Sequence, residues 1–517
     1  MSPEWIGWFV CTLSRRDDDA WGAGGNRVVR EWRASRWGVV GITLLAAVVR
    51  LPGLGARSLW FDEALSGCIA RLNTLSVLIN TAGSSHPPGY YLLLHLWRPL
   101  GSSEFALRLP STLCSLLAVA LTWGLARELF DRRTAWLAAL GMAMAPFQVY
   151  YAQEARGYAL TIALSAGLMW CFFRGVQRDT WWPWGGYGLL VILGLYTHYF
   201  TALVVLALHL WLLLNLQRGR AVLLPLILAD ALAALAFMPQ VRQFSVETGE
   251  YLSGRTSWQP SPSLLSPFTT LYYLLFGHVM PLGWVWAGLF LTLAVVVLGG
   301  VELVRSGWKR ASVSQAWALA VAVAIPVLVI LAISLTIRSI YLERSFAVVT
   351  PALTVWLARG IATAPRRSPT PYLGAALAAL MTVGTVLHFV QPDPAKPPLR
   401  EAIEVVAEGM EAGDVSLHWQ DASYLPALYY APEQAGVLVD AGQRLWLSPE
   451  VYALFNGRVI TEAALPASGR VWLTVMPGYV GPAQAKLLAW WDATRTPLET
   501  RDWEAVQVRL YAPGGKP

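Results

Sequence analysis

The chain has 517 residues, of which 56% are hydrophobic and only 14% are charged. Soluble domains carry about a quarter charged residues, so this composition excludes an ordinary soluble protein and indicates a multi-pass membrane protein. The net charge of +7 comes from short basic clusters between apolar runs, which argues against a nucleic-acid-binding surface. The four cysteines, Cys11, Cys68, Cys114 and Cys171, show neither disulfide-framework nor zinc-ligand spacing.

Long apolar runs separated by polar turns predict about 11 transmembrane helices. The predicted spans are 37–53, 108–127, 135–151, 158–174, 183–197, 199–216, 221–239, 282–304, 316–337, 344–360 and 371–390. We expect a transmembrane region over 37–391 and a cytoplasmic tail over 1–36, which has no cleavable signal peptide.

Arginine clusters set the predicted topology. The tail 1–36 is rich in arginine, and so are the turn 127–133 and every second turn after it, as the positive-inside rule requires of cytoplasmic segments. The apolar stretch 87–101 cannot then be a complete span, and we interpret it as a half-buried helix within a first outer loop, 54–107. We expect the protein in the plasma (inner) membrane, with its N-terminus in the cytoplasm and its C-terminus outside.

The composition changes after residue 391. A proline-rich linker, 392–398, leads into helix-like patterns over 400–410 and 482–491 and strand-like patterns over 414–418, 470–476 and 505–511. This pattern predicts a small extracytoplasmic α/β domain over 392–517.

The first outer loop holds an acidic pair, Asp62 and Glu63, at the start of an amphipathic stretch. Acidic residues near a helix N-terminus also stabilise the helix dipole, which leaves a structural explanation open. Four further outer segments carry polar groups, and each has its own structural explanation, as a turn residue, an aromatic belt or a snorkelling arginine. They are His86; Glu154, Arg156 and Tyr158; His198 and Tyr199; and Arg338, Glu343 and Arg344.

Together these groups fit one reaction. Glycosyl transfer from a lipid phosphate needs a carboxylate base for the acceptor's proton. Its phosphate leaving group needs cationic stabilisation, which arginine supplies through its planar fork of donors.

Six ordered motifs resemble bacterial membrane glycosyltransferases of the family 39 type, relatives of protein O-mannosyltransferases and of the lipid A aminoarabinose transferase. These are Trp60–Glu63, His86–Tyr91, Arg108–Ser111, Tyr150–Tyr158, Tyr196–Tyr199 and Glu343–Arg344. The resemblance implies the C-type glycosyltransferase fold, a polyprenyl-phosphate sugar donor and inversion at the anomeric carbon. It implies catalytic roles for Asp62 and Glu63, with Asp62 as base. We expect substrate binding by Arg57, His86, Glu154, Arg156, Tyr158, His198, Tyr199, Glu343 and Arg344.

We expect no metal and no other cofactor, because no additional acidic cluster is evident. The predicted partners are the donor, the bilayer and a lipid, glycan or protein acceptor. A transporter or flippase for an amphipathic anion would also explain outer arginines, although such proteins bind near the midplane and often contain repeats. A non-catalytic scaffold gives no account of the acidic pair.

Overall fold

The structure is a computed structural model that describes most of the chain. The described residues are 25–83, 86–178, 180–215, 222–253, 259–278, 282–305, 311–365, 367–393, 396–440, 445–465, 469–503 and 505–513. The first 24 residues of the predicted cytoplasmic tail therefore lie outside them.

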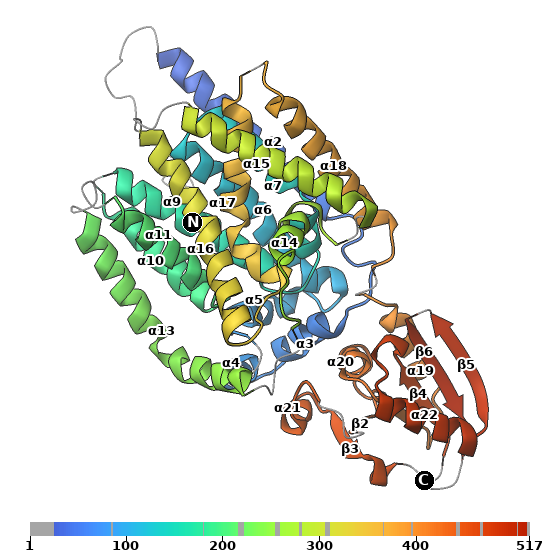
Figure 1. Ribbon diagram of the computed structural model, residues 1–517. Coiled ribbons are helices and arrows are strands. Elements are labelled where there is room, and N and C mark those ends of the chain that lie inside the picture. The colour runs from blue at the N-terminus through green and yellow to red at the C-terminus, as the bar shows by residue number, and fades with distance from the viewer. Residues whose placement is uncertain are drawn as a thin grey trace.

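Residues 25–390 form a helical bundle (Figure 1). Its long helices are α2 (Gly25–Arg50), α6 (Glu104–Leu129), α7 (Arg132–Met144), α9 (Tyr158–Gln177), α10 (Trp182–Leu195), α11 (Thr201–Leu213), α13 (Leu223–Leu252), α15 (Val285–Arg305), α16 (Ala311–Thr336), α17 (Thr350–Thr363) and α18 (Thr370–Val390). The buried core lies between them and is built from alanine, leucine and aromatic side chains. A helical multi-pass membrane protein is confirmed.

Six described segments are long and apolar enough to cross a bilayer. They are Glu104–Leu129, Tyr158–Gln177, Leu223–Leu252, Gln315–Thr336, Glu343–Thr363 and Thr370–Val390, and four shorter apolar helices accompany them, at Trp37–Arg50, Trp182–Leu195, Thr201–Leu213 and Val285–Ala294. The total of 11 crossings stays a prediction.

Three predicted spans are not continuous α-helices, and one of them, 282–304, begins as the 3-10 helix η3 (Leu282–Trp284) before α15. The run 135–151 is divided between α7 and α8 (Pro146–Ala152), because Ala145 precedes a proline and adopts extended backbone angles. The run 344–360 begins as the 3-10 helix η4 (Glu343–Val349) and becomes α-helical only at Thr350. Helix α13 continues to Leu252, well past the predicted end at 239, and α14 (Ser266–Phe276) was not predicted.

The first outer loop folds into short helices rather than an open segment. They are α3 (Phe61–Ala70), α4 (Leu75–Gly83), α5 (Gly89–Trp97) and the 3-10 turn η1 (Arg98–Leu100). Helix α5 confirms the half-buried helix expected within 87–101, because Tyr90, Tyr91 and Leu94 are buried whereas Leu96 is exposed. We call the end of the bundle at which α3 and α5 lie the site end, and the opposite end the far end.

The C-terminal region forms a six-stranded sheet in the order β3-β2-β1-β4-β6-β5. The strands are β1 (Val415–His418), β2 (Val437–Asp440), β3 (Arg458–Thr461), β4 (Val471–Val475), β5 (Pro497–Trp503) and β6 (Val506–Tyr511). The first four in this order are parallel, whereas β6 pairs antiparallel with β4 and with β5. Helices α19 (Leu399–Gly409), α20 (Asp421–Tyr430), α21 (Pro449–Leu454) and α22 (Pro482–Thr494) accompany the sheet, so the predicted α/β region is confirmed.

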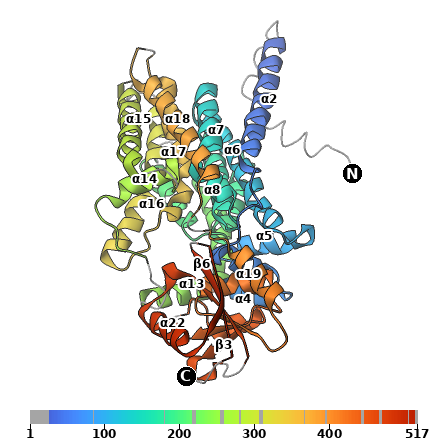
Figure 2. The same ribbon diagram turned by 90° about the vertical axis from the view of Figure 1, so that its right-hand side faces the viewer.

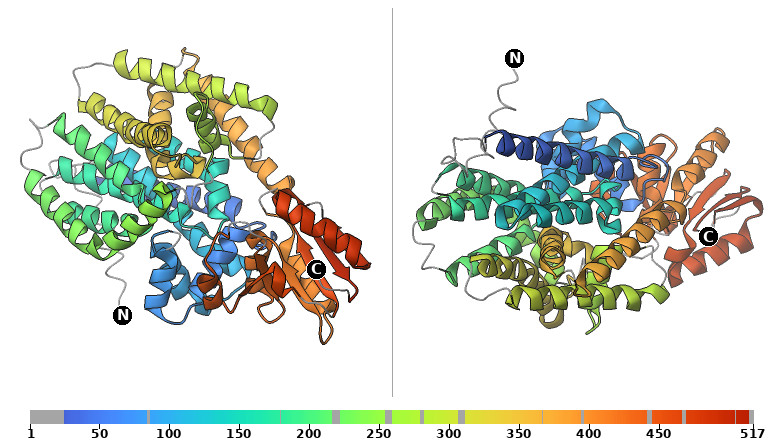
Figure 3. Two further views of the ribbon diagram at one scale, coloured as in Figure 1. Left: turned by 60° about the horizontal axis from the view of Figure 1, so that its bottom comes forward. Right: turned by 90° about the horizontal axis from the view of Figure 1, so that it is seen from above.

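This sheet region sits on the site end of the bundle (Figure 2). In both views of Figure 3, the sheet region lies beside the end of α18 and away from α13. Its contact with the first outer loop is close: a Cβ on Gly67 of α3 would come within 2.3 Å of the Tyr429 ring of α20. The Arg71 guanidinium stacks 3.7 Å from the centre of that ring and donates to the Tyr429 carbonyl at 2.8 Å. Helix α3 is thus packed between the bundle and the sheet region.

Candidate functional site

The acidic pair lies in the first turn of α3, which begins at Phe61 after the extended residue Trp60. No side-chain hydrogen bond caps this helix, so the two carboxylates act on its dipole only through their charge. Successive residues of a helix are rotated by about 100°, so Asp62 and Glu63 point in different directions. The structure gives them different surroundings and therefore different uses.

Glu63 is completely buried and fully paired. Its two oxygens accept from Arg108 of α6, at 2.7 Å from Nε and 2.8 Å from Nη2, and Oε1 also accepts the Ala155 N–H at 2.9 Å. Lys396 places its ammonium 3.3 Å from Oε2. Burial by itself would raise the pKa of Glu63, but Arg108 and Lys396 outweigh it and hold the pKa at about 2. Glu63 therefore ties α3 to the bundle as a permanent anion.

Asp62 is the accessible carboxylate, with 15% of its side chain exposed. Its Oδ2 lies 3.9 Å from Nε of Arg156 and 3.7 Å from Nη1 of Arg344. Arg156 comes from the turn between α8 and α9, and Arg344 from the start of η4. Two arginines from distant parts of the sequence thus converge on one carboxylate without tight hydrogen bonds to it.

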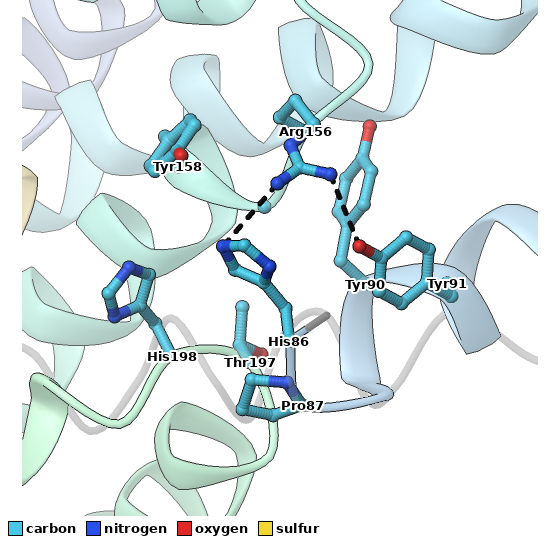
Figure 4. A pocket seen from close by; sticks show the side chains of 9 residues that line it. His86, Pro87, Tyr90, Tyr91, Arg156, Tyr158, Thr197 and His198 are labelled. Carbon is cyan, nitrogen blue, oxygen red and sulfur yellow. Dashed lines mark hydrogen bonds between the residues drawn. The ribbon is translucent and has the colours of Figure 1, made fainter. Parts of the chain in front are cut away.

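A small pocket opens beside this cluster (Figure 4). Arg156 extends its fork into it, with Nη1 donating to the Tyr91 hydroxyl at 3.2 Å and Nη2 lying 3.4 Å from Nε2 of His86. The remaining lining residues are Pro87, Tyr90, Gly157, Tyr158, Thr197 and His198. Arginine, imidazole and phenol groups around one hollow suit an anionic or hydroxyl-rich ligand.

Gly89 brings the two walls of this pocket together. Its N–H donates to the Tyr196 carbonyl at 2.7 Å, and a Cβ at this position would lie 2.6 Å from the same oxygen. The close approach sets the His86 and His198 rings 6.2 Å apart. Burial, with Arg156 and Arg344 nearby, lowers the pKa of His198 to about 4, so its imidazole is neutral at pH 7.

Glu154 is a second buried carboxyl at the site. Trp60 donates to its Oε1 at 3.1 Å, whereas Oε2 has no hydrogen-bond partner among the described residues. Burial raises the pKa of Glu154 to about 7, with Lys396 and Arg344 opposing the rise and Glu63 and Asp62 adding to it. Glu154 can therefore change its protonation state near neutral pH, unlike Glu63.

Five of the nine predicted substrate-binding residues are not among the residues that line this pocket. Glu154 and Arg344 belong to the charged cluster around Asp62, and the other three are Arg57, Tyr199 and Glu343. Arg57 donates to the carbonyls of His388 and Gln391, at the end of α18. The Tyr199 hydroxyl donates to Glu247 of α13, at 3.4 Å. Glu343 begins η4, beside Arg344. The structure brings together the other predicted residues, Asp62, Glu63, His86, Glu154, Arg156, Tyr158, His198 and Arg344.

Sequence reasoning gave no site role to Arg108, Trp60 or Lys396. Arg108 could have been noticed as a charge inside an apolar span, where an ionisable side chain needs a partner. Lys396 carries no such signal, because it lies in a proline-rich segment far along the chain. The described residues contain no group of three or more histidine, cysteine, aspartate or glutamate side chains placed to hold a metal ion, and metal independence stays a prediction.

The fold and the position of the site define the class: a membrane protein with the C-type glycosyltransferase fold, carrying an acid–arginine cluster at one end of its helical bundle. Residues 85–241 match the family model described as dolichyl-phosphate-mannose-protein mannosyltransferase. A comparison with curated protein sequences gives no match.

Particular solved structures share the fold over nearly the whole chain. ArnT from Cupriavidus metallidurans bound to undecaprenyl phosphate matches with a TM-score of 0.64 at 15% identity, covering 92% of this chain and 98% of that one. The apo state of the same protein matches with a TM-score of 0.61 at 16% identity and with the same coverage. The Archaeoglobus fulgidus oligosaccharyltransferase in complex with Zn and sulfate gives 0.52 at 13% identity, covering 92% of this chain and 73% of that one. The similarity to ArnT includes the sheet region, since both chains are covered almost completely.

Proposed function

We propose that the protein is an integral-membrane glycosyltransferase that moves a sugar from a polyprenyl phosphate to an acceptor on the outer face of the membrane. The observation that carries this proposal is the part-exposed carboxylate of Asp62 between Arg156 and Arg344, at the end of the bundle and beside a polar pocket. The match to a mannosyltransferase family model and the fold shared with a protein that binds undecaprenyl phosphate support it.

The chemistry requires one base and one anion-binding site. Asp62 takes the proton from the acceptor hydroxyl or amine, and the acceptor atom forms a bond to the anomeric carbon of the donor sugar. The bond from that carbon to the phosphate oxygen breaks, and its electron pair leaves on polyprenyl phosphate. Attack on the face opposite the leaving phosphate inverts the anomeric carbon.

Arg156 and Arg344 stabilise the phosphate as its charge develops. Arg156 is suited to this because its Nη atoms face the pocket while only its Nε faces Asp62. His198, which is neutral at pH 7, and Glu154 offer hydrogen-bonding groups to the sugar hydroxyls. The sugar is a hexose or a pentose, and the acceptor is a lipid, a glycan or a protein in the cell envelope.

The transporter alternative gains no support. Its binding site is expected near the middle of the bilayer. Here the acidic and arginine side chains gather where helices begin or end, in the first turn of α3, the turn before α9 and the start of η4.

The test measures release of free polyprenyl phosphate by purified protein in lipid, using a panel of polyprenyl-phosphate sugars and candidate acceptors. We expect wild type to release it, and Asp62→Asn to be slower by about 10³-fold or more because the acceptor keeps its proton. Asp502→Asn, on the exposed strand β5, is the matched control and should behave as wild type. Normal turnover by a folded Asp62→Asn variant would overturn the mechanism, and transport without release would favour the transporter.

A further inference from the structure

The stretch between α18 and α19, which we call the joining segment, connects the bundle to the sheet region. The side chain of its Lys396 lies at the site. Lys396 is only 9% exposed, although it lies among prolines in the stretch between α18 and α19. Its ammonium lies 3.3 Å from Oε2 of Glu63 and donates to the Gln153 carbonyl at 3.2 Å. It also lies 5.6 Å from the centre of the Tyr150 ring. A buried ammonium is costly unless it is paired, so these contacts define its position.

The end of α18 and the start of α19, on either side of this segment, hold the stretch that leads to the acidic pair. Arg57 donates to the carbonyls of His388 and Gln391, at 2.5 Å and 3.1 Å. The Ser58 hydroxyl donates to Glu401 at 2.9 Å and accepts the Arg400 N–H at 3.2 Å. These contacts fix the backbone just before α3 from the C-terminal side of the molecule.

Lys396 also links α3 to the turn that carries Glu154, through Glu63 and the Gln153 carbonyl. Glu63 is held on one side by Arg108 and on the other by Lys396, and its Oε1 accepts the N–H of Ala155, the residue after Glu154. One lysine thus reaches both α3, which carries Asp62, and the turn that carries Glu154 and Arg156. Removing it would loosen the two elements that must be aligned for transfer.

We propose that Lys396 is a positioning residue of the transfer site: it aligns α3 with the 153–157 turn, so that glycosyl transfer depends on the seating of the joining segment against the first outer loop. This inference rests on the proposed function. It assigns Lys396 no contact with substrate, and it makes the C-terminal region part of the catalytic structure rather than a separate cover.

The pH dependence provides a readout that separates loss of charge from loosened packing: loosened packing would reduce the burial of Glu154 and lower its pKa, whereas loss of the lysine charge raises that pKa. Lys396, Arg344, Glu63 and Asp62 act on the charge of Glu154, and Trp60 is its hydrogen-bond donor. Arg156, Tyr150 and Tyr151 also interact electrostatically with Glu154. Burial raises the pKa of Glu154 to about 7, and the Lys396 ammonium limits that rise. If ionised Glu154 favours transfer, the rate increases with pH through about 7 in wild type. Loss of the lysine charge raises the pKa of Glu154 and moves this increase to higher pH.

The experiment compares wild type, Lys396→Met, Lys396→Arg and Arg400→Met, using whichever polyprenyl-phosphate sugar wild type turns over. Arg400 is the matched control, because it pairs with Glu104 and Glu401 near the same junction but does not contact Glu63. We expect Lys396→Met to lower kcat at least tenfold with donor KM changed less than threefold, since misplacement of about 1 Å costs up to about 10²-fold in rate. Arg400→Met should keep wild-type kcat and pH profile, and Lys396→Arg should recover most of both.

Each outcome decides a separate point. Equal kinetics for Lys396→Met and Arg400→Met in an active background would overturn the role of Lys396. Glu154→Gln is the reference variant for the pH profile, because it lacks the titrating carboxyl. An unchanged pH profile in Lys396→Met would overturn the charge coupling between Lys396 and Glu154. If Lys396→Met fails to fold, Lys396→Gln takes its place. Full activity of Lys396→Gln would overturn the positioning role of Lys396. Loss of activity in Lys396→Gln, together with recovered activity in Lys396→Arg, would support that role. A wild type that turns over no donor would instead overturn the proposed function.

Discussion

Adjacent carboxylates at this site have separate tasks because of what surrounds them. Glu63 is buried among Arg108, Lys396 and the Ala155 N–H, whereas Asp62 keeps part of its side chain exposed. A base must reach its substrate and must bind and release a proton, which Glu63 cannot do from inside an ion cluster. We therefore propose that, of the two predicted catalytic acids, Asp62 is the base and Glu63 is a structural anion.

Glu63→Gln should lower the stability of the protein, because Glu63 is a structural anion rather than a reacting group. The substitution leaves Arg108 and Lys396 buried without their anion, and breaking a buried pair in this way costs about 3–5 kcal/mol. We expect a clearly lower unfolding temperature in detergent, measured by a thermal-shift assay. The pKa of Glu63, held near 2, also implies that its contribution to stability persists above about pH 4.5 and is lost only as the pH falls toward 2.

Glu401→Gln is the comparison for this prediction. Glu401 pairs with Arg400 but 42% of its side chain is exposed, so we expect its loss to cost less than about 1 kcal/mol. A Glu63→Gln variant as stable as wild type and yet inactive would show that Glu63 takes part in the reaction itself.

At the scale of elements, the pocket depends on one close backbone contact. Gly89 starts α5 against the Tyr196 carbonyl, and this contact sets where His86 and His198 stand. Because the neighbour is a backbone oxygen at 2.6 Å from a Cβ position, it cannot rotate away as a side chain could. Alanine at this position must push α5 away from the 196–198 turn.

Gly89→Ala should therefore weaken donor binding more than it lowers stability. We expect the donor KM to rise about tenfold or more in the polyprenyl phosphate release assay, with the protein still folded. Gly185→Ala is the control, because a Cβ on this helical glycine meets nothing within 4 Å. In a helix it should be neutral or stabilising by up to about 1 kcal/mol. Equal donor KM values for the two variants would show that the Gly89 contact does not shape the donor pocket.

The sequence predicts elements best where one local signal decides the structure. Long apolar runs gave nearly every bundle helix, because a membrane span has few alternatives to a helix. Strands β2, β3 and β5 were missed. β2 and β3 have four residues each, and so short a run carries little periodicity, whereas β5 is exposed along most of its length and shows no apolar alternation. At the site, charged residues at outer boundaries were found, but Lys396 was not, because only the fold brings the joining segment back to α3.

At the scale of the whole molecule, the two ends of the bundle differ in charge. Among the described residues, the far end carries at least six arginines and two acids that pair with some of them, Glu128 and Asp131. These arginines are Arg127, Arg132, Arg133, Arg174, Arg178 and Arg359. The site end holds the acid–arginine cluster and the sheet region. Positive charge gathers on the cytoplasmic side of membrane proteins, so we propose that the site end and the sheet region face outward.

Cysteine labelling tests this orientation. In a variant whose four native cysteines are replaced by alanine, Glu433→Cys places a thiol on an exposed position of the sheet region, and Arg133→Cys places one at the exposed start of α7. A membrane-impermeant maleimide should label Glu433→Cys in intact spheroplasts and Arg133→Cys only after permeabilisation. The reverse pattern would put the transfer site in the cytoplasm. Donor and acceptor would then have to meet on the inner face, and the charge difference between the two ends would need another cause.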